Sequence, residues 1–350
     1  MDFITNGQAT GDVATTLMDN NFDAGALRPY VGNDGRPRIT VNRGDGNGVQ
    51  TLITNAPATL RKDDWIMLDQ AVIKAAKPRL NVVSDLRGAG LQLTLSNGMA
   101  KTVLQHEKQS DISDATISMD GMRQGERDRP QFSIENLPLP IIHKDFSFSA
   151  RQLAASRNGG SPLDTTTAEL AGRRVAEEAE KLHLGVASSY TYGGGTVYGL
   201  TNFPDRLTKS LTAPTTSNAA VVVAEILAMR SQCEANNYYG PWVLYHSPAY
   251  HEFMDGDYDT ANRNGATMRQ RIMRIDGIQA VKQADYLTGS QLILVQQTSD
   301  VARTVVGMDI TTVQWESHGG MQLNFKVMAI LVPQLRSDYS SQTGIVHGSV

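Results

Sequence analysis

A long amphipathic pattern between Asp164 and Ala187 places the strongest constraint on how this chain folds. Small and apolar residues recur there every three or four positions, with charged residues between them. The apolar positions are Ala168, Ala171, Val175, Ala179, Leu182 and Val186. At ~1.5 Å rise per residue the segment predicts a helical rod of roughly 36 Å. Thr166, with Glu169 three residues later, predicts a capping box at its start.

The charged positions of this helix are expected to form its outer face. They are Arg173, Arg174, Glu177, Glu178, Glu180 and Lys181. A charged helix face of this kind is either simply solvated or available to a partner, and the pattern alone favours neither reading.

A second helix is predicted over residues 63–76. Trp65, Leu68 and Val72 share one face, Asp63 or Asp64 caps the start, and Pro78 ends the helix. The following residues, Leu80–Leu86, are predicted to form a strand.

The region from residue 80 to residue 142 alternates short apolar runs with polar links, and no helix of useful length is expected in it. We interpret it as a long two-armed β excursion whose polar tip is Gly121–Pro130; a disordered insertion is the alternative. Arms of about 20–25 residues, at ~3.3 Å per residue, would reach roughly 65–80 Å. Because two-stranded ribbons are marginally stable alone, we expect the excursion to lie on another copy of the chain.

The remaining chain predicts a second, compact α/β unit. A strand and a short helix are expected over residues 141–157, a glycine-rich hinge over 191–206 and the α/β unit over 217–300. Two long strands should follow residue 302, and the last 15 residues are expected to close the domain that holds the 164–187 helix. Residues 1–50 are expected to form an arm with one short helix near residues 12–22, and the turn-rich stretch Gly32–Gly48 is expected to bury little.

Length and charge limit the function classes. A chain of 350 residues suggests two domains, and 32 basic against 36 acidic residues give a net charge of -4. This nearly balanced charge does not fit a protein that binds nucleic acid through one large basic patch. No basic-then-apolar signal pattern opens the chain and no apolar run approaches ~18 residues, so neither a standard secretory signal nor a membrane span is expected.

The sequence offers no convincing catalytic or metal constellation. Seven histidines are scattered, and His246 and His251 lack a third ligand at metal-site spacing. Residues 255–265 begin like a calcium loop, but Thr260 replaces the required glycine and Ala266 the final glutamate. The one cysteine, Cys233, falls on the apolar side of a predicted helix. We therefore predict no enzyme, no metal and no cofactor.

Four segments in order resemble the major capsid proteins of tailed bacteriophages, which have the Hong Kong 97 fold, and the related encapsulin shell proteins. They are DDWIMLDQAVIKAAKPRLNVVSDLRGAG (63–90), the segment from Ile141 to Val186, VYGLTNFP (197–204), and the ending from Val327 through Gly348. Each segment taken alone is a weakly specific match, and together the four segments cover about a third of the chain.

The resemblance implies an α+β Hong Kong 97-type capsid fold with an N-terminal arm, an extended β loop, a spine helix in a peripheral domain, and an α/β axial domain. The implied boundaries are 1–62 for the arm, 63–84 for the start of the peripheral domain, 85–140 for the extended loop, 141–198 for the peripheral domain with the spine helix, 199–301 for the axial domain and 302–350 for strands that complete the peripheral domain.

The function implied is a major capsid protein that self-assembles, as pentamers and hexamers, into the icosahedral head of a tailed phage around double-stranded DNA. A compartment shell of the encapsulin type, enclosing a cargo enzyme, is the alternative. Portal and possibly scaffolding or decoration proteins, and weak non-specific contact with packaged DNA, are the other implied partners. The implied location is the virion capsid, assembled in the host cytoplasm.

Candidate contacts between subunits are the charged residues of the spine helix and the arginines of the loop tip. They are Arg173, Arg174, Glu177, Glu178, Arg123, Arg127 and Arg129. Some members of the family crosslink a loop lysine to an asparagine; Lys101 and Lys108 lie in the loop, but no motif identifies an acceptor, so no crosslink is assigned.

Overall fold

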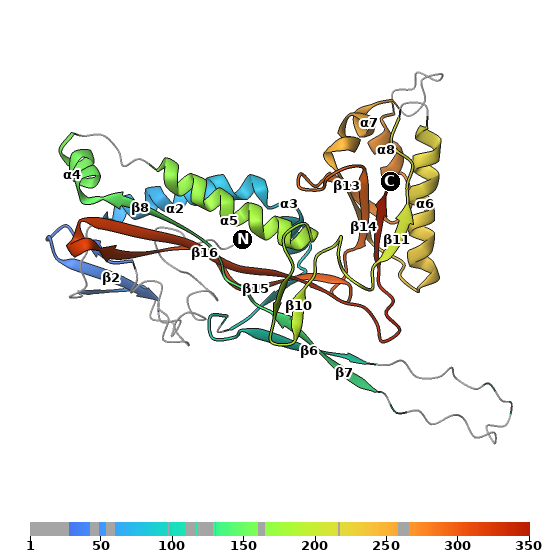
Figure 1. Cartoon of the computed structure of the whole chain (residues 1–350), viewed down its shortest axis with the longest axis horizontal. Helices are drawn as coiled ribbons and strands as arrows, with labels where there is room; N and C mark the ends of the chain where they lie inside the picture. Colours follow the sequence, from blue (N-terminus) through green and yellow to red (C-terminus); the bar gives the residue numbers. More distant parts are fainter. Residues whose placement is uncertain are drawn as a thin grey trace. The chain divides into compact units, whose positions relative to one another are not determined.

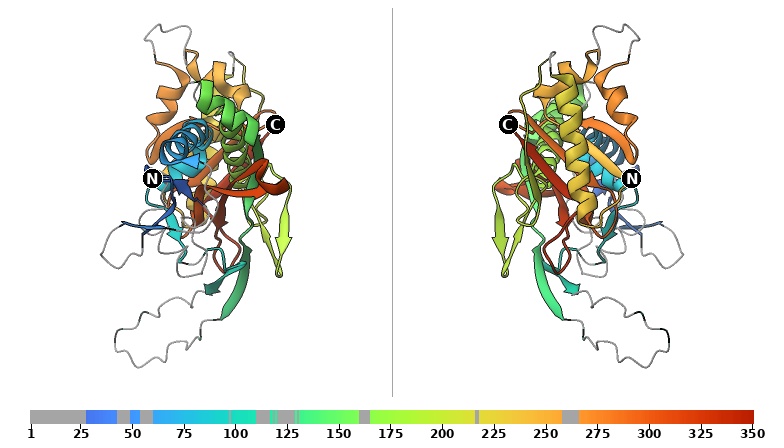
Figure 2. Two further views of the ribbon diagram at one scale, coloured as in Figure 1. Left: turned by 90° about the vertical axis from the view of Figure 1, so that its left-hand side faces the viewer. Right: turned by 90° about the vertical axis from the view of Figure 1, so that its right-hand side faces the viewer.

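The computed structural model describes most of the chain outside the N-terminus and a few internal segments. The described residues are 28–42, 49–53, 60–96, 98–109, 117, 119, 129, 131–159, 165–215, 218–257 and 266–350. The expected helix near residues 12–22 lies outside them. The chain divides into two compact units (Figures 1 and 2), each built from three separate stretches of sequence.

The first unit contains residues 1–102, 139–188 and 303–333. Its main sheet has the strand order β5-β15-β16-β8. The bounds are Gln92–Thr94 for β5, Ala302–Ser317 for β15, Gln322–Leu335 for β16 and Ile142–Ser149 for β8. β8 pairs antiparallel with β16, and β5 pairs parallel with β15. The two long strands β15 and β16, from the C-terminal part of the sequence, therefore lie between the shorter strands β5 and β8, which come earlier in the sequence.

Helices α2 (Lys62–Ala76) and α5 (Thr166–Leu184) lie side by side along this sheet (Figure 1). Their apolar faces pack on Phe325 and its neighbours in β16. Trp65 meets the Phe325 ring edge-on, with 5.9 Å between ring centroids. The apolar faces predicted for both helices are confirmed for the buried residues Trp65, Leu68 and Val72 of α2 and Ala168, Ala171, Val175, Ala179 and Leu182 of α5. The prediction is wrong for Val186, which lies beyond the end of α5 and is 42 % exposed.

The start of α5 differs from the prediction. The N-cap is Thr165, whose side chain accepts no capping bond, and Thr166 is already the first helical residue. The predicted capping box of Thr166 and Glu169 is therefore wrong. The helix ends at Gly185, which takes a left-handed conformation (φ 81°) that costs glycine little. The predicted cap of α2 at Asp63 or Asp64 is also wrong, because the N-cap is Arg61 and both acids lie within the first turn; the Arg61 N–H donates to the Asp64 carboxylate over 2.9 Å.

Residues predicted to form a strand at Leu80–Leu86 instead form helix α3 (Asn81–Gly88), which follows the short 3₁₀ turn η1 (Lys77–Arg79). Both the strand and the expected absence of a useful helix in this region are wrong. Val82, Val83 and Leu86 are buried against the rest of the unit, so tertiary packing overrides the local preference of the two valines for strands.

The arm region contributes a small sheet with the order β3-β2-β1-β4. Its strands are Val49–Ile53 (β3), Pro37–Asn42 (β2), Tyr30–Val31 (β1) and Leu60–Arg61 (β4). Residues on either side of the turn-rich stretch Gly32–Gly48 are buried: Leu60 is fully buried, and Arg28 is buried over the Trp65 ring with its guanidinium 2.6 Å from Asp69. Helix α4 (Ala150–Gly159) and the 3₁₀ turn η3 (His318–Gly320) complete the first unit.

The second unit contains residues 103–138, 189–302 and 334–350. Its five-stranded sheet has the order β11-β17-β14-β12-β13. The strands are Leu207–Ser210 (β11), Ile345–Ser349 (β17), Gln291–Gln296 (β14), Trp242–His246 (β12) and Ile278–Gln283 (β13), and the helical elements are α6 (Ala219–Ala235), η2 (Pro248–Tyr250), α7 (His251–Asp255) and α8 (Met268–Met273). The predicted compact α/β unit is confirmed in its elements.

Strand β17 corrects one expectation. The last residues were expected beside the spine helix, but Ile345–Ser349 pair with β14 and β11 and so complete the sheet of the second unit. Val346 and Ile345 are fully buried there. Period-2 patterning marks a strand but does not tell which sheet it joins.

Two hairpins belong to the same unit. β6 (Val103–Gln109) and β7 (Phe132–Pro138) form an antiparallel ribbon, which is the described part of the predicted β excursion. The short hairpin of β9 (Tyr190–Tyr192) and β10 (Gly195–Val197) packs at the ribbon's base. Within the described residues, none of the helices is both long and apolar enough to span a bilayer.

Candidate functional site

Three of the four candidate contact residues of α5, Arg173, Arg174 and Glu177, form one ion-pair cluster. The Glu177 carboxylate lies 2.9 Å from Arg174 Nη1 and 3.4 Å from Arg173 Nε, and Arg79 approaches it to 4.0 Å from η1. Glu177 is 8 % exposed, whereas the Arg174 side chain is 63 % exposed. Several guanidinium groups therefore share one shielded carboxylate and present donors outward.

A small cleft joins this cluster to strand β8. Its volume is about 330 Å³, and it is lined by His143, Lys144, Arg174, Val175, Glu177, Glu178 and Lys181. The sequence-based candidates Arg174, Glu177 and Glu178 thus lie together, with Glu178 3.6 Å from Lys181. His143 and Lys144, which complete the cleft, were not singled out by the sequence because they lie far away on another element.

The predicted charged outer face of α5 is wrong for Glu177, which is 8 % exposed, and most clearly for Glu180. This side chain is 1 % exposed and accepts hydrogen bonds from the N–H groups of Val82 (2.7 Å) and Val83 (3.3 Å). It therefore caps the first turn of α3, which has no side-chain cap of its own. Burial, with a smaller contribution from the nearby Asp85, raises the pKa of Glu180 to about 7 against these hydrogen bonds.

His183, one turn further along α5, is also buried. Its Nδ1 donates to the Ala179 carbonyl at 2.8 Å, and its Nε2 lies 3.3 Å from the Thr304 hydroxyl of β15. Burial lowers the pKa of His183 to about 4, so the ring is neutral at pH 7. Both nitrogens have structural partners, which gives this histidine a packing role.

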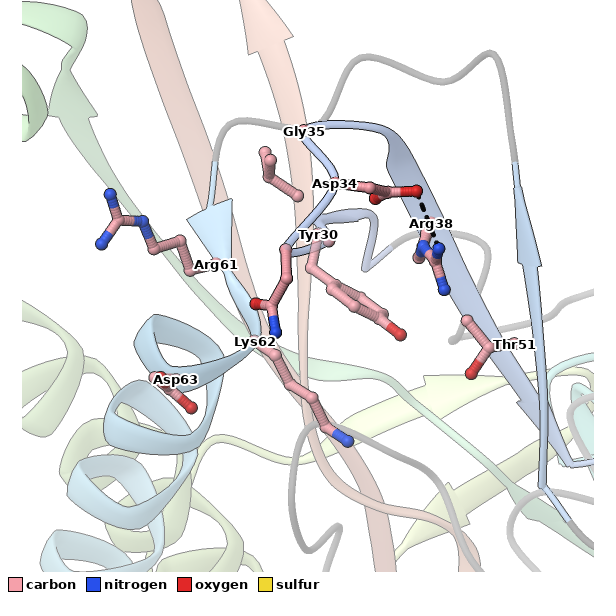
Figure 3. A pocket seen from close by; sticks show the side chains of 11 residues that line it. Tyr30, Asp34, Gly35, Arg38, Thr51, Arg61, Lys62 and Asp63 are labelled. Atoms are coloured by element: carbon pink, nitrogen blue, oxygen red, sulfur yellow. Dashed lines mark hydrogen bonds and ion pairs between the residues drawn. The ribbon is translucent and has the colours of Figure 1, made fainter.

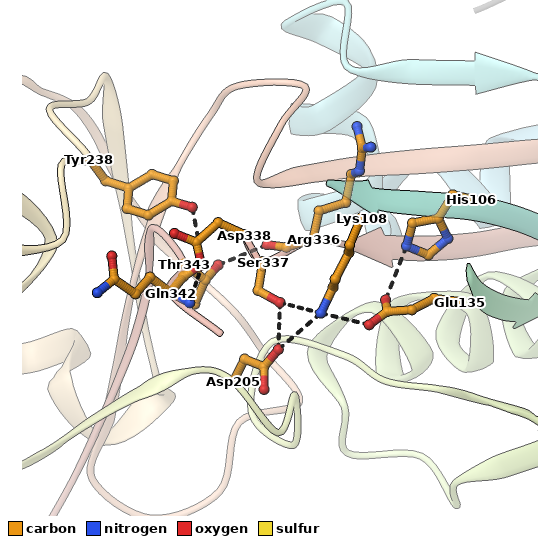
Figure 4. A network of polar contacts seen from close by, with 10 residues as sticks. All are labelled: His106, Lys108, Glu135, Asp205, Tyr238, Arg336, Ser337, Asp338, Gln342 and Thr343. Carbon is orange, nitrogen blue, oxygen red and sulfur yellow. Dashed lines mark hydrogen bonds and ion pairs between the residues drawn. The ribbon is translucent and has the colours of Figure 1, made fainter. Parts of the chain in front are cut away.

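A polar network fixes the base of the β6–β7 ribbon (Figure 4). Lys108 Nζ lies 2.6 Å from Glu135, 3.2 Å from Asp205 and 2.6 Å from the Ser337 hydroxyl, which itself donates to Asp205. Burial acts against the charge of Lys108, but its hydrogen bonds and ion pairs with Glu135 and Asp205 outweigh burial and raise its pKa. The ammonium group is held as a cation in a structural role.

His106 lies next to Lys108 in this network. Its Nε2 is 3.2 Å from Glu135. Burial lowers the pKa of His106 more than the Glu135 carboxylate raises it, and Arg336 also lowers it. The sequence did not reveal this network, because its members come from β6, β7 and two distant loops.

The opposite face of the ribbon is exposed. Register pairs Glu107 with Ile134 and Gln109 with Phe132, and the Ile134 and Phe132 side chains are 64 % and 58 % exposed. Further along, Ile117 and Met119 are exposed almost completely. Of the tip candidates, Arg129 is exposed, whereas Arg123 and Arg127 lie outside the described residues.

A second cavity of the first unit, about 930 Å³, lies between the β1–β2 turn and the start of α2 (Figure 3). Arg61 and Lys62 line it, and the Nη2 atom of Arg38 lies 2.8 Å from the Asp34 carboxylate. The Asp34–Arg38 pair is over a third exposed, so this is an open, solvated hollow and not a shielded site.

The remaining chemical candidates lie apart. No group of three possible metal ligands occurs among the described residues. His246 is buried with its Nδ1 3.0 Å from the Ser247 carbonyl, whereas His251 is exposed near Asp255. Burial raises the pKa of Cys233 to about 12, which suppresses its thiolate form. Most of the 255–265 loop lies outside the described residues.

Residues 55–348 match a family described as a family of unknown function, DUF6260. A comparison with curated proteins gives no match. Among solved structures, the virus-like particle from Pyrococcus furiosus is 14% identical and superposes with a TM-score of 0.58 over 80% of this chain and 97% of that chain.

Two further structures agree with the first. The capsid of Myoviridae phage XM1 is 12% identical, with a TM-score of 0.54 over 76% of this chain and 90% of that one. The capsid of a native GTA particle is 13% identical, with a TM-score of 0.52 over 77% and 90%. The predicted α+β Hong Kong 97-type fold is confirmed by these similarities.

Proposed function

The chain belongs to the DUF6260 family, and from its fold we propose that it is the major capsid protein of a tailed double-stranded DNA phage. In this role, copies assemble as pentamers and hexamers into an icosahedral head that encloses the genome. The protein acts by self-association and not by catalysis.

The observation that carries this proposal is the extent of the structural similarity. Matches with a TM-score above 0.5 cover 90–97% of the shell subunits compared. The similarity therefore extends over nearly the whole of each subunit and is not confined to one shared motif. Because a fold alone does not fix a function, the proposal also needs support from the chain's own surfaces.

The β6–β7 ribbon supplies that support. Two-stranded ribbons are marginal in water, and this one exposes Phe132 and Ile134 on one face. Contiguous exposed apolar side chains mark interaction sites in soluble proteins. A neighbouring copy would cover this face in an assembled shell.

The same proposal assigns the first unit to the peripheral domain and the second to the axial domain, with the ribbon as the extended loop. Arg123, Arg127 and Arg129 at the loop tip and the charged residues of α5 stay candidate contacts between subunits. Portal, scaffolding and decoration proteins are proposed partners, together with weak, non-specific contact to packaged DNA. The proposed location is the virion, after assembly in the host cytoplasm.

Purified protein tests the proposal directly. We expect closed particles in negative-stain micrographs and a fast-sedimenting species in the ultracentrifuge. A chain that stays a 38.1 kDa monomer at high concentration would refute every shell role. Particles with a genome and one portal vertex support the virion.

A compartment shell around a cargo enzyme is the second candidate function. The similarity to the Pyrococcus furiosus particle favours it, because that structure, which has the highest TM-score of the three described, is named as a virus-like particle and not as the capsid of a phage. Mass spectrometry of particles isolated from the native source separates the two: a co-purified enzyme without DNA supports the compartment, and a portal with DNA supports the phage head.

The extended loop gives a sharper test. Replacing residues 110–131 by Asn-Gly joins β6 to β7 by a two-residue turn that suits an antiparallel hairpin. We expect a folded subunit with an unchanged circular dichroism spectrum that forms no shells. Normal shells from this variant would contradict the assembly role of the loop.

A further inference from the structure

Polar side chains at its base attach the β6–β7 ribbon to the rest of the second unit (Figure 4). Among the described strands, β6 and β7 pair only with each other, so no larger sheet holds them in place. The attachment includes Lys108, which contacts Asp205 and the Ser337 hydroxyl, and the Tyr339 hydroxyl, which donates to the Gln131 side chain over 2.8 Å. The position of the ribbon therefore depends on the charges of a few side chains.

His106 lies among these charges. Its side chain is 11 % exposed, its Nε2 lies 3.2 Å from Glu135, and its Nδ1 has no hydrogen-bond partner in the described part of the chain. An imidazolium ring carries an N–H on both nitrogens. Protonation would therefore bury an unpaired Nδ1–H and add a positive charge next to Lys108 and Arg336. Glu135 offsets only part of this cost, because its carboxylate also binds Lys108 at 2.6 Å.

His347 of β17 makes a second contact that needs a neutral ring. Its Nδ1 accepts the Nε–H of Arg206 at 3.4 Å, and its Nε2 lies 3.3 Å from Gln291 Oε1. A proton on Nδ1 would set two donors against each other. Arg206 also donates to the Phe203 carbonyl over 2.8 Å and adjoins Asp205, which binds Lys108. Loss of the contact between Arg206 and His347 would therefore disturb the turn that holds the ribbon.

The surroundings of both histidines oppose protonation. Burial lowers the pKa of His106, and Arg336 and Lys108 lower it further against the opposing effect of Glu135. Burial and Arg206 lower the pKa of His347. A histidine whose pKa is lower in the attached state than in the released state stabilises attachment above about pH 6.5 and loses that contribution as pH falls. Both rings therefore act in the same direction.

We propose that the base of the β6–β7 ribbon is an acid-sensitive latch, in which protonation of His106 and His347 weakens the hold of Asp205 and Ser337 on Lys108. Acid would loosen the attachment of the ribbon while the five-stranded sheet of the unit stays folded. The latch acts inside one subunit, so it goes beyond the proposed shell role and does not depend on it.

Hydrogen exchange of the full-length chain, kept as dissociated subunits, tests the latch. Protection factors, which correct for the pH dependence of intrinsic exchange, are compared at about pH 7.5 and 5.5 for Val103–Gln109, for Phe132–Pro138 and, as an internal reference, for α6. A two-stranded ribbon that loses its attachment opens easily, so its protection should fall at least about tenfold in acid. The protection of α6 should stay unchanged. Equal ribbon protection at both pH values would overturn the proposal.

The variant H106Q/H347N removes both titrating rings. The glutamine keeps an amide N–H for Glu135, and the asparagine keeps an oxygen for the Arg206 N–H, so the ribbon should stay attached at both pH values. The matched control is His251→Gln, which removes a 56 % exposed histidine of the same unit and should keep the wild-type response. A wild-type response in the double variant would assign the acid sensitivity to other groups and overturn the latch.

A further variant serves if circular dichroism shows that the double variant misfolds. Arg336→Gln removes one cation that opposes protonation of His106 and leaves both histidines in place. The fall in ribbon protection between the two pH values should then be smaller than in the wild type. A fall of equal or greater size would overturn the role of His106.

The outcomes also separate the latch from the shell. A wild-type chain that forms shells but shows no acid response refutes only the latch. A chain that stays monomeric and shows the response refutes the shell role and supports the latch.

Discussion

The carboxylate of Glu180 accepts the backbone N–H of Val82 at 2.7 Å, although 98 positions separate the two residues in the chain. This contact ties helix α5 to the first turn of α3 inside the first unit. An acid at a helix N-terminus satisfies free N–H groups and complements the positive end of the helix dipole. The cap of α3 is therefore supplied by another helix.

This contact should make stability depend on pH in an unusual direction. The pKa of Glu180 is raised from 4.5 to about 7 in the folded state, so the fold favours the protonated form. Its contribution, about 3 kcal/mol, is fully present below about pH 4.5 and is lost as pH rises through 7. Relative to Glu180→Gln, the wild-type subunit should lose unfolding free energy between pH 5 and 8.

Urea titrations of dissociated subunits at several pH values measure this difference. Subtracting the Glu180→Gln curve removes the contributions of other carboxyl groups. A difference that stays constant from pH 5 to 8 would mean that Glu180 has no raised pKa in the folded subunit.

The pair Arg87–Asp309 should be costly to break. The guanidinium Nη1 lies 2.5 Å from the carboxylate, Nη2 lies 3.2 Å from its second oxygen, and both side chains are at most 10 % exposed. Arg87→Met leaves a buried, unpaired carboxylate and should lower the unfolding free energy by about 3–5 kcal/mol. The double variant R87M/D309L should recover most of this loss in the same chemical denaturation assay. A single variant as stable as the wild type would contradict the prediction.

Gly172 should be intolerant of a methyl group. A Cβ there would lie 2.8 Å from Val72 Cγ1 and 3.0 Å from the Val72 carbonyl, where α5 crosses α2. Gly172→Ala gains ~1 kcal/mol of helix propensity, but overpacking costs about 1–3 kcal/mol, so we expect net destabilisation. The control is Gly88→Ala in α3, where nothing lies within 4 Å; it should be neutral or stabilising. In thermal melts, the melting temperature of Gly172→Ala should lie below that of the wild type, and that of Gly88→Ala should equal or exceed it.

Lys108 should hold the ribbon in place. Lys108→Met leaves Glu135 and Asp205 facing each other without a cation, at a cost of about 1–3 kcal/mol. Amides of Val103–Gln109 and Phe132–Pro138 should then exchange faster with solvent. Lys101→Met, at an exposed position, is the control and should leave these amides unchanged. Unchanged exchange in both variants would show that the ribbon does not depend on Lys108.

Much of the local structure could be predicted from the sequence, whereas the candidate contact residues could be predicted only in part. The apolar faces of α2 and α5 follow helical spacing and pack as predicted. Arg174, Glu177 and Glu178 were found because they lie on one helix face, and they line one cleft. Lys144 also lines that cleft, but the spacing of residues in the sequence could not predict this, because it depends on how β8 packs against α5.

By itself, the sequence determined where the long helices lie and which sides of them face the core, because apolar spacing and helix propensity act between near neighbours. Only the tertiary structure decided that residues 81–88 are a helix, that Glu180 is buried and that β17 joins the second sheet. Each of these depends on a partner far along the chain. The local sequence pattern places Glu180 on the solvated face of its helix. Only the tertiary structure brings its carboxylate to the start of α3, where it accepts hydrogen bonds from two backbone N–H groups.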